Sequence, residues 1–475
     1  MRIKMLLSDK NILVLGCGES GIAMANWCLE QNCKVSIADT RENPPMLAQL
    51  EEGIKFYHGI NTKLIDEINP NIILLSPGLS PYYSPIKEIY KYKNIPTYGE
   101  LWLFNQALEQ LATKQNYQPK IIAITGTNGK TTTTKLTAHL CNYAGKTAEV
   151  AGNVSPSMLC ALSNHLKNET LPQVWVLELS SFQLHDVNGF VPHAATILNI
   201  SLDHLDWHSD MHNYIVSKFN IAGKNDNYAT KLILNRDDEI LQKYIDLLNL
   251  DKNNLVSFGI DMPSNHDFGL AKQNDGYWLY HEQKNLMPIN ALKIRGLHNA
   301  QNAMAALALC DAIDIKIADV IGGLLTYQGE PHRVEFIDII NDIEIYDDSK
   351  GTNVGATVAA INGLEKKIIL IAGGDGKGQD FSDLEKPFKQ FVQSVHLIGK
   401  DKLEIAKICD KANVSYTIYD SLEEATFNAC SIAKSGEAVL LSPACASWDM
   451  FNNYAHRADV FCKSVAEWKE GLGIT

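Results

Sequence analysis

The sequence lacks an excess of basic residues. Its 42 lysines and arginines are outnumbered by 55 aspartates and glutamates, which leaves a formal net charge of −13. A chain with this balance does not offer the broad basic surface that a nucleic-acid backbone requires, so we expect no nucleic-acid partner. Any phosphate group would have to be bound in a local pocket.

Paired cysteines and long apolar runs are also missing. None of the ten cysteines forms a C-x-x-C pair and no cysteine–histidine spacing suggests zinc, so we expect reduced, mostly buried thiols. No stretch of about 18 uninterrupted apolar residues occurs. The start of the chain, MRIKMLLSDKNILVLG, has no cleavage pattern. We therefore expect a soluble, cytoplasmic protein without membrane insertion.

What the sequence does contain is an alternation of short apolar runs with helical patterns, which predicts parallel sheets. The alternation begins with NILVLG, KVSIAD and NIILLSPG, restarts at IIAIT, and restarts again at IEIYDDS and KKIILIAGG. The length of 475 residues suits about three domains. We predict an α/β protein with domains at 1–98, 99–329 and 330–475. Residues 237–290 give the weakest signals.

A first glycine loop, GCGESG, follows the first predicted strand and precedes a helix. Gly16, Gly18 and Gly21 have the G-x-G-x-x-G spacing, and Asp39 ends the next strand. This order is typical of a dinucleotide-binding turn, in which the acid binds a ribose hydroxyl. Glycines required only for packing are the alternative. Glu19 within the loop is mildly unfavourable for an anion.

A second glycine loop, ITGTNGKTTTT, also lies between a strand and a helix. It resembles a phosphate-binding P-loop, but Ile124 stands where the signature has its first glycine. Lys130 would contact the β- and γ-phosphates, and the Thr131 hydroxyl could bind magnesium. The alternative is a glycine-capped turn before a threonine-rich helix. A dehydrogenase needs only the first loop and a kinase only the second.

Polar residues follow the next two predicted strands. Glu178 ends VWVLELS, where a magnesium ligand would lie beside a P-loop, although a solvated acid is the alternative. NISLDHLDWH places Asp203, His204, Asp206 and His208 together, which suits a second metal or an acid–base role. Helix capping would also explain these residues.

The third domain repeats this arrangement at three strand ends. Lys350 follows one strand, Lys377 the next, and Ser447 a later one. Because the carboxyl ends of parallel strands meet at one edge of a sheet, we expect these groups to converge. Lysine and hydroxyl groups there suit a small substrate that carries a carboxylate. Turn chemistry explains neighbouring glycines and aspartates, but not easily the two lysines.

Taken together, these motifs resemble the Mur ligase family of peptidoglycan synthesis. The resemblance runs nearly end to end, through GCGESG, SPG at 76–78, TGTNGKTTTT, AGN at 151–153, LELSSFQL, NISLDHLDWH, GLHNAQNAMAAL, PHR at 331–333, DDSKGTN, GGDGKGQDF and SPACASWDMF. The GTNGKT loop alone is shared with folylpolyglutamate synthases. The first domain and SPACASWDMF favour the branch that adds D-glutamate. The family's ATP loop lacks the first glycine, which accounts for Ile124.

The resemblance implies a fold and an activity. It implies a Rossmann-like N-terminal domain that binds a uridine diphosphate sugar, a central P-loop-type ATPase domain, and a Rossmann-like C-terminal domain that binds an amino acid. The activity would be ATP-dependent addition of D-glutamate to UDP-N-acetylmuramoyl-L-alanine through an acyl phosphate. ATP and two Mg²⁺ ions would be the cofactors, and the protein would be a monomer.

The resemblance also implies site residues. The ATP site would comprise Gly126, Thr127, Asn128, Gly129, Lys130, Thr131, Thr132, Asn299, Asn302, Arg333 and Asp348. The UDP-substrate site would comprise Gly18, Glu19, Ser20, Asp39, Thr40, Arg41, Ser76, Pro77, Gly78 and Asn153. D-Glutamate would contact Thr352, Lys377, Ser447 and Tyr454, and the metal ligands would be Thr131, Glu178, His204 and Lys218. The catalytic set would be Lys130, His204, Lys218 and Lys350.

Lys218 owes its place entirely to the resemblance, because its pattern alone is that of an ordinary helical lysine. The family carbamylates the lysine at this position, which converts a cation into an anion that binds magnesium. Trp448, after Ser447, departs from the aliphatic residues common in the family. The base that deprotonates the amine could be His204 or Asp206.

Three alternatives stay open from the sequence. The chain could be another Mur-type or folylpolyglutamate-type ligase, an NAD-dependent oxidoreductase built on GCGESG, or a non-catalytic ATP-binding regulator. The presence of Lys130, Glu178, His204 and Lys218 speaks against the last.

Overall fold

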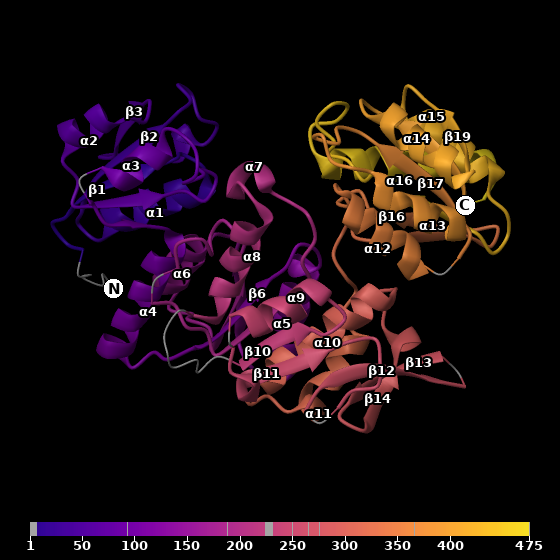
Figure 1. Cartoon of the computed structure of the whole chain (residues 1–475), viewed down its shortest axis with the longest axis horizontal. Helices are drawn as coiled ribbons and strands as arrows, with labels where there is room; N and C mark the ends of the chain where they lie inside the picture. The colour runs from indigo at the N-terminus through magenta and orange to yellow at the C-terminus, as the bar shows by residue number, and fades with distance from the viewer. Residues whose placement is uncertain are drawn as a thin grey trace. The chain divides into compact units, whose positions relative to one another are not determined.

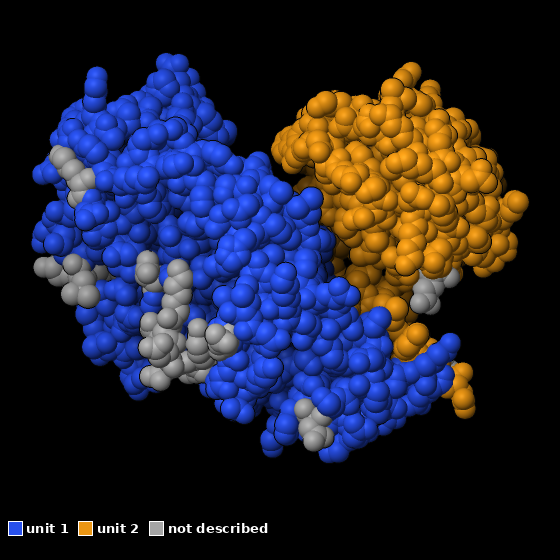
Figure 2. All heavy atoms as spheres, in the orientation of Figure 1, with its two compact units in different colours: residues 1–273, 278–287, 302–324 blue, residues 274–277, 288–301, 325–475 orange. Residues whose placement is uncertain are grey.

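A computed structural model of the chain describes residues 7–92, 94–187, 189–223, 231–248, 250–264, 266–274, 276–364 and 366–474. The strands form three sheets (Figure 1). The chain divides into two compact units, shown in different colours in Figure 2. The first comprises residues 1–273, 278–287 and 302–324, and the second comprises residues 274–277, 288–301 and 325–475.

The first sheet has five strands in the order β3-β2-β1-β4-β5, and all its pairs are parallel. The strands are β1 Asn11–Leu15, β2 Lys34–Asp39, β3 Lys55–His58, β4 Ile72–Leu75 and β5 Thr97–Tyr98. The helices between them are α1 Glu19–Glu30, α2 Thr62–Ile68 and α3 Ile86–Lys91. The order reverses at β1 and β4, so the loops after these two strands lie at a switch point of the sheet.

The central sheet has nine strands in the order β14-β13-β12-β11-β10-β9-β6-β8-β7. The strands are β6 Lys120–Thr125, β7 Ala148–Gly152, β8 Val174–Glu178, β9 Ala194–Ile197, β10 Lys231–Asn235, β11 Leu255–Phe258, β12 Phe268–Gln273, β13 Gly276–His281 and β14 Lys284–Pro288. The helices are α4 Glu100–Gln115, α5 Lys130–Tyr143, α6 Met158–Asn168, α7 Leu205–His208, α8 Met211–Phe219, α9 Glu239–Leu247, α10 Leu297–Asp311 and α11 Ile317–Val320.

The third sheet has six strands in the order β15-β16-β20-β17-β18-β19. The strands are β15 Glu335–Ile340, β16 Ile343–Asp347, β17 Ile368–Gly373, β18 Val392–Ile398, β19 Ser415–Ile418 and β20 Ala438–Leu441. The helices are α12 Val354–Leu364, α13 Glu385–Phe391, α14 Lys402–Ala412, α15 Leu422–Ile432 and α16 Tyr454–Gly471. Only the β15–β16 pair among the described pairs of this sheet is antiparallel.

Alternate residues of the parallel strands are buried on opposite faces of a sheet. In β1, Ile12 and Val14 belong to one hydrophobic cluster, whereas Leu13 and Leu15 belong to another. The same alternation occurs in β17. A strand buried on both faces reads as a continuous apolar run, because helices cover the sheet on both sides. This is why the apolar runs predicted the strands.

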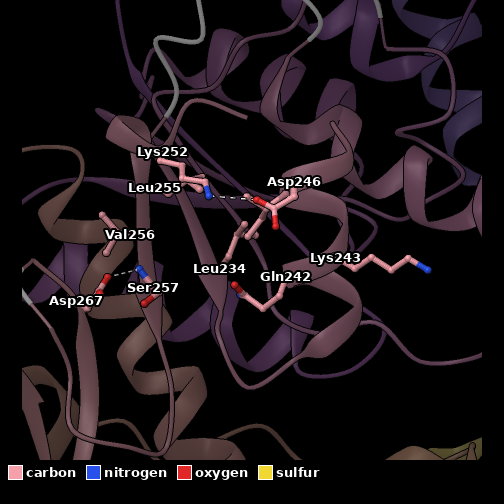
Figure 3. Close-up of a pocket in the computed structure, with 10 residues that line it drawn as sticks. Leu234, Gln242, Lys243, Asp246, Lys252, Leu255, Val256, Ser257 and Asp267 are labelled. Carbon is pink, nitrogen blue, oxygen red and sulfur yellow. Dashed lines mark hydrogen bonds and ion pairs between the residues drawn. The ribbon is translucent and has the colours of Figure 1, made fainter. Parts of the chain in front are cut away.

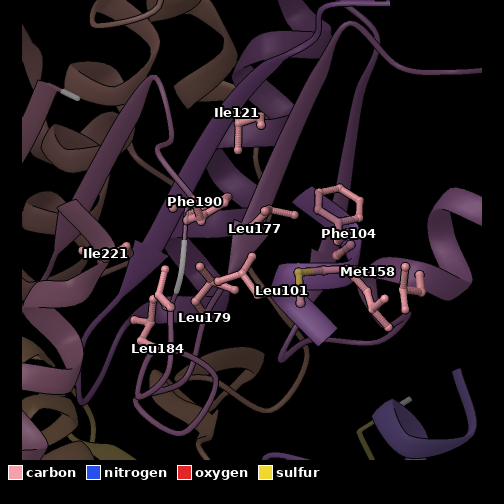
Figure 4. Close-up of a cluster of buried hydrophobic side chains, with 14 of the residues drawn as sticks. Leu101, Phe104, Ile121, Met158, Leu177, Leu179, Leu184, Phe190 and Ile221 are labelled. Carbon is pink, nitrogen blue, oxygen red and sulfur yellow. The ribbon is translucent and has the colours of Figure 1, made fainter. Parts of the chain in front are cut away.

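One hydrophobic cluster continues from the first sheet into the central one. Leu101 and Phe104 of α4 pack with Met158 of α6 and Leu177 of β8 (Figure 4). The Phe104 ring meets the ring of Trp175 edge-on, with 5.2 Å between centroids. Burial of each such side chain contributes about 1.5–3 kcal/mol. The first two sheets therefore share one core within the first unit.

The predicted α/β fold with parallel sheets is confirmed, whereas the stretch 237–290 holds strands that the sequence did not indicate. Strands β11 to β14 lie there, and many of their residues are only partly buried, so they lack the continuous apolar runs of central strands. The domain limits at 98 and 329 stay predictions. The first sheet ends at Tyr98 and the third begins at Glu335.

The ten cysteines are free, and eight of them are buried. Among the described residues, no helix is both long enough and apolar enough to cross a membrane.

Candidate active site

The second glycine loop lies between β6 and α5, at the carboxyl edge of the central sheet. Gly129 directly precedes α5 and has a φ of +81°, which lies in the left-handed region that favours glycine. A Cβ atom added there would lie 2.6 Å from Oδ1 of Asn302. Glycine is therefore required, and it has no side chain to cap the helix. The amino end of such a helix binds anions through its first N–H groups.

Ile124 lies inside β6 and is fully buried. It pairs with Glu178 of β8 on one side and with Thr196 of β9 on the other. The residue that occupies the position of the missing glycine is thus part of the sheet rather than of the turn. An apolar side chain is the natural choice there, because it is buried in the core.

Asn199 holds the loop in place from the end of β9. Its backbone carbonyl accepts a hydrogen bond from the N–H of Thr127 at 2.9 Å. Its side-chain amide pairs with both backbone groups of Asn128: Oδ1 accepts from the N–H at 2.8 Å, and Nδ2 donates to the carbonyl at 3.1 Å. These three bonds fix the loop backbone from outside.

Two lysines converge on one carbonyl of the loop. Lys130 Nζ donates to the carbonyl oxygens of Gly126 and Thr127 at 2.9 and 2.7 Å, and Lys218 Nζ donates to that of Gly126 at 2.8 Å. Lys218 is 2% exposed, and its ammonium group lies 4.7 Å from the centre of the Tyr214 ring. Burial, and then the charge of Lys130, lower the pKa of Lys218 well below its ordinary value. Both effects act against the charged form of Lys218.

Glu178 is the last residue of β8 and lies between the loop strand and β7. It pairs with Ile124 and with Gly152, and it is 2% exposed. Its Oε1 accepts a hydrogen bond from Nδ2 of Asn153 at 2.8 Å, whereas Oε2 is buried without a hydrogen-bond partner. A buried carboxylate oxygen without a partner is costly, and a bound cation would satisfy it.

His204 precedes α7 in a left-handed conformation, with a φ of +54°. Its Nε2 lies 3.4 Å from Oδ2 of Asp203. The side chain of His204 is 47% exposed, and its partial burial lowers its pKa; Asp203 opposes this effect, whereas Lys130 and Lys218 add to it. A neutral imidazole is the form that binds metals.

Of the other polar residues of NISLDHLDWH, Asp203 lies beside His204, whereas Asp206 and His208 have different surroundings. Asp206 lies exposed in the first turn of α7. His208 is fully buried, and its Nε2 lies 2.9 Å from Oγ of Ser181. Burial lowers the pKa of His208 to about 3. The structure therefore does not gather the four residues into one cluster.

In the first glycine loop, packing requires two of the glycines and leaves space at the third. A Cβ atom at Gly16 would lie 2.7 Å from Cβ of Ser76, and one at Gly21 would lie 1.8 Å from the carbonyl oxygen of Gly16. A Cβ atom at Gly18 would meet no atom within 4 Å. Gly18 precedes α1, so the open position is at a helix amino end. The side chain of Glu19, the first residue of α1, accepts a hydrogen bond from Ser155.

Asp39 organises this loop. Its Oδ2 accepts a hydrogen bond from the N–H of Cys17 at 2.7 Å, and Arg41 binds both oxygens at 2.9 Å. Burial raises the pKa of Asp39, but the bonds from Arg41 and Cys17 outweigh it and hold the pKa at about 2. Thr40 is exposed between them. Ser76, Pro77 and Gly78 follow β4 on the same edge.

In the second unit, Arg457 of α16 joins two loops, the one after β16 and the one after β20. It is fully buried; Nε and Nη2 donate to Oγ and the carbonyl oxygen of Ser349 at 3.0 and 2.7 Å, and Nη1 donates to the carbonyl of Cys445 at 3.2 Å. Oγ of Ser349 donates in turn to the carbonyl of Tyr454 at 2.8 Å. Burial lowers the pKa of Arg457 to about 10.

Arg457 therefore anchors segments that carry predicted D-glutamate ligands. Lys350 follows Ser349, and its Nζ lies 5.1 Å from the centre of the Tyr454 ring. Ser447 lies two residues after Cys445 and is 3% exposed. Lys377 lies in a separate loop after β17, with a φ of +53°, and its N–H donates to Oδ1 of Asp375. Thr352 lies in the loop between β16 and α12.

Three predicted ATP residues also lie in the second unit. Asp348 follows β16 and accepts a hydrogen bond from Oγ of Ser442 at 2.6 Å. Burial raises its pKa to about 7. Asn299 donates through Nδ2 to the carbonyl of Arg295 at 2.8 Å, and Arg333 precedes β15. Asn302 belongs to the first unit, where its Oδ1 accepts from Oγ1 of Thr133 in α5.

A cavity of about 450 Å³ lies apart from these residues, between α9, β10 and β11 (Figure 3). Lys252 forms an ion pair with Asp246 on its rim, and Asp267 accepts a hydrogen bond from the N–H of Ser257. None of the predicted site residues lines this cavity. We therefore assign it no part in the chemistry.

The sequence did not indicate Asn199 or Arg457. Asn199 does carry a signal, because it ends a predicted strand like Glu178, but its short amide side chain is common in turns. Arg457 lies in a predicted helical stretch, where an exposed arginine is the ordinary expectation.

Three family models match the chain. The model described as the Mur ligase MurD-like N-terminal domain matches residues 10–97. The Mur ligase middle domain matches residues 124–310, and the Mur ligase glutamate ligase domain matches residues 332–445.

Curated proteins with high similarity carry one name. The chain is 48% identical over 497 residues to the UDP-N-acetylmuramoylalanine–D-glutamate ligase of Burkholderia ambifaria, with 98% of each chain covered. It is 47% identical over 497 residues to the ligase of the same name from Paraburkholderia phymatum, with 97% of each covered.

Solved structures share the fold at low sequence identity. MurF ligase from Thermotoga maritima in complex with ADP has a TM-score of 0.57 at 16% identity, covering 97% of this chain and 96% of that one. UDP-N-acetylmuramate-alanine ligase MurC from Thermotoga maritima has a TM-score of 0.55 at 17% identity, covering 96% and 99%.

Proposed function

The chain belongs to the Mur ligase family, and from that membership we propose that it joins D-glutamate to UDP-N-acetylmuramoyl-L-alanine in an ATP-dependent step of peptidoglycan synthesis. The observation that carries the proposal is the 48% identity, over 98% of the chain, to a curated ligase with this name. The three matched domain models and the ADP-bound structural neighbour support the use of ATP.

The reaction activates a carboxylate for attack by an amine. The lactoyl-alanine carboxylate attacks the γ-phosphorus of ATP, which gives an acyl phosphate and ADP. The neutral amine of D-glutamate then attacks the acyl carbon, phosphate leaves with the bonding electron pair, and the nitrogen releases a proton as the amide forms, for which His204 or Asp206 is the candidate acceptor. Phosphorylation is needed because a carboxylate is electron-rich and lacks a good leaving group.

The glycine loop supplies the positive groups for phosphoryl transfer. The amino end of α5 would bind the phosphates, and Lys130 would exchange its bonds to loop carbonyls for bonds to phosphate oxygens. In that position its charge stabilises the transferring group. Thr127, Asn128 and Thr132 would line the same loop. Asn299, Asn302, Arg333 and Asp348 are proposed for the remainder of ATP.

The donor atoms fit magnesium. Glu178 offers a buried carboxylate oxygen without a hydrogen-bond partner, and Thr131 offers a buried hydroxyl at the start of α5. We propose these two residues, together with His204 and Lys218, as ligands of two Mg²⁺ ions. When bound, magnesium would neutralise charge on the phosphates.

Carbamylation of Lys218 completes the ligand set. A neutral amine adds to carbon dioxide and releases a proton, which leaves a carbamate with two oxygens. Burial and the charge of Lys130 lower the pKa of Lys218, which makes its amine easier to deprotonate for this reaction. Conversion to an anion would also remove the repulsion between the two lysines, which share the carbonyl of Gly126.

The other substrates would occupy the remaining strand ends. The UDP-substrate would bind the first glycine loop with Ser20, Asp39, Thr40 and Arg41, the segment 76–78, and Asn153. D-Glutamate would bind Thr352, Lys377, Ser447 and Tyr454, and Lys350 would be directed toward the phosphates. Because ATP is the phosphoryl donor, we place the reaction in the cytoplasm, and we propose a monomer, which light scattering would check.

One assay separates this function from its alternatives. Release of ADP is measured with UDP-N-acetylmuramoyl-L-alanine and each of several amino acids, including D- and L-glutamate. We expect ADP release when D-glutamate is the amino acid. We expect no ADP release when either UDP-N-acetylmuramoyl-L-alanine or the amino acid is omitted. Turnover with another amino acid, or with a folate acceptor, would indicate a different ligase. NAD binding without ADP release would indicate an oxidoreductase, and ATP binding without turnover on any acceptor a regulator.

A further inference from the structure

Trp207 connects the loop after β4 in the first sheet to the turn that carries His204 in the central domain. Its indole Nε1 donates a hydrogen bond to the carbonyl of Pro77 at 3.0 Å. In the opposite direction, Oγ of Ser80 donates to the backbone carbonyl of Trp207 at 2.6 Å. Side chain and backbone of one residue are therefore both bound to the segment 77–80.

The indole ring is held in a single orientation. It stacks on the ring of Phe182 with 4.7 Å between centroids and 21° between planes. The rings of Tyr82 and His185 meet it edge-on at 6.2 and 5.5 Å. Trp207 is 7% exposed. Aromatic contacts on several sides leave it little freedom, so its hydrogen bond to Pro77 has a fixed direction.

The position of Trp207 in α7 makes this contact relevant to the site. Helix α7 has four residues and begins directly after His204. The N–H of Trp207 donates to the carbonyl of His204 at 3.1 Å. A displacement of the indole would therefore disturb the turn that holds His204, because Trp207 is one of the two buried residues that attach this four-residue helix to its surroundings.

We propose that Trp207 is a positioning residue that keeps the segment 76–80 in register with the turn at His204. The consequence is that the carboxylate of the nucleotide sugar arrives at the ATP loop already aligned. This inference rests on the proposed function, which assigns Ser76, Pro77 and Gly78 to the UDP-substrate. Neither Trp207 nor Ser80 is assigned a contact with substrate.

Two variants remove the two hydrogen bonds separately. Trp207→Phe keeps an aromatic ring but removes the donor to Pro77, and Ser80→Ala removes the donor to the carbonyl of Trp207. Each loss should weaken binding of the nucleotide sugar about fivefold, or about 1 kcal/mol. Trp468→Phe is the matched control, because Trp468 is similarly buried, at 6% exposed, in the second unit.

The experiment measures binding of UDP-N-acetylmuramoyl-L-alanine to the full chain by calorimetry, without ATP or metal, together with steady-state kinetics. We expect Kd and KM for the nucleotide sugar to rise in both variants and kcat to fall. The KM for D-glutamate and the Kd for ADP should stay within about twofold. Thermal unfolding shows whether each variant is folded. If Trp207→Phe does not fold, Ser80→Ala alone tests the inference.

Unchanged nucleotide-sugar affinity in folded variants would overturn the inference. An equal loss of ADP affinity, or the same effect in Trp468→Phe, would also overturn it by indicating general destabilisation. These outcomes are distinct from failure of the proposed function, which would appear as absence of turnover in the wild-type chain.

Discussion

The buried carboxyl group of Asp348 makes the stability of the second unit depend on pH. Asp348 is 5% exposed, and burial raises its pKa from 3.8 to about 7, although Ser442 donates a hydrogen bond to it. Between these two values the folded chain binds more protons than the unfolded chain. The free energy of unfolding therefore falls as pH rises through this window, and the loss is complete above pH about 7. A shift of about three units corresponds to about 4 kcal/mol.

Asp348→Asn removes this titration while keeping the shape of the side chain. Its Oδ1 can still accept from the N–H of Val334, and the hydroxyl of Ser442 can accept from the new amide. Relative to wild type, the variant should gain about 2–3 kcal/mol of stability between pH 5 and pH 8. Amide hydrogen exchange in peptides from α12 and β17, measured without ligands, reports the stability of the second unit separately from that of the first.

Exposed Asp383→Asn is the control for this measurement, because the side chain lies on the surface of the same unit. Parallel stability curves for wild type and Asp348→Asn between pH 5 and pH 8 would refute the reasoning. So would an equal difference in Asp383→Asn, since the effect would then not depend on burial.

Three further variants test the first unit. Asn199→Asp replaces the donor to the carbonyl of Asn128 with a carboxylate oxygen. The KM for ATP should therefore rise about tenfold, while the KM for D-glutamate stays constant. An unchanged KM for ATP would contradict the role of Asn199. Glu178→Gln should raise the Mg²⁺ concentration for half-maximal rate about tenfold, without lowering the melting temperature in metal-free buffer. Lys218→Ala should lower turnover about a hundredfold, with partial recovery on addition of short carboxylic acids; loss without recovery would leave the carbamate unsupported.

The sequence predicted most of the fold because its strands are buried on both faces. Continuous apolar runs such as NILVLG and KKIILIAGG correspond to β1 and β17. Strands β11 to β14 escaped prediction since partial exposure breaks up their apolar runs. The glycine loops were visible because a left-handed φ, as at Gly129, or a contact with backbone, as at Gly21, allows only glycine.

The residues that hold the loops of the site in place could not be predicted from the sequence, because their hydrogen-bond partners lie far away along the chain. Asn199 binds a residue 71 positions away, Trp207 one 130 positions away, and Arg457 one 108 positions away. No local pattern records which loop a side chain will meet after folding. These contacts become evident only when the sheet order is known.

A difference in chemical constraint explains why the sequence singles out candidate ligand-binding residues but not the residues that support them. A group that stabilises a phosphate or binds magnesium must carry a particular charge or donor atom, so few residue types serve and Lys130 or Glu178 stands out at a strand end. A supporting residue needs only to donate or accept a hydrogen bond to backbone, which many polar side chains can do. Trp207 therefore reads as an ordinary core aromatic in the sequence, and only its bond to the carbonyl of Pro77 distinguishes it.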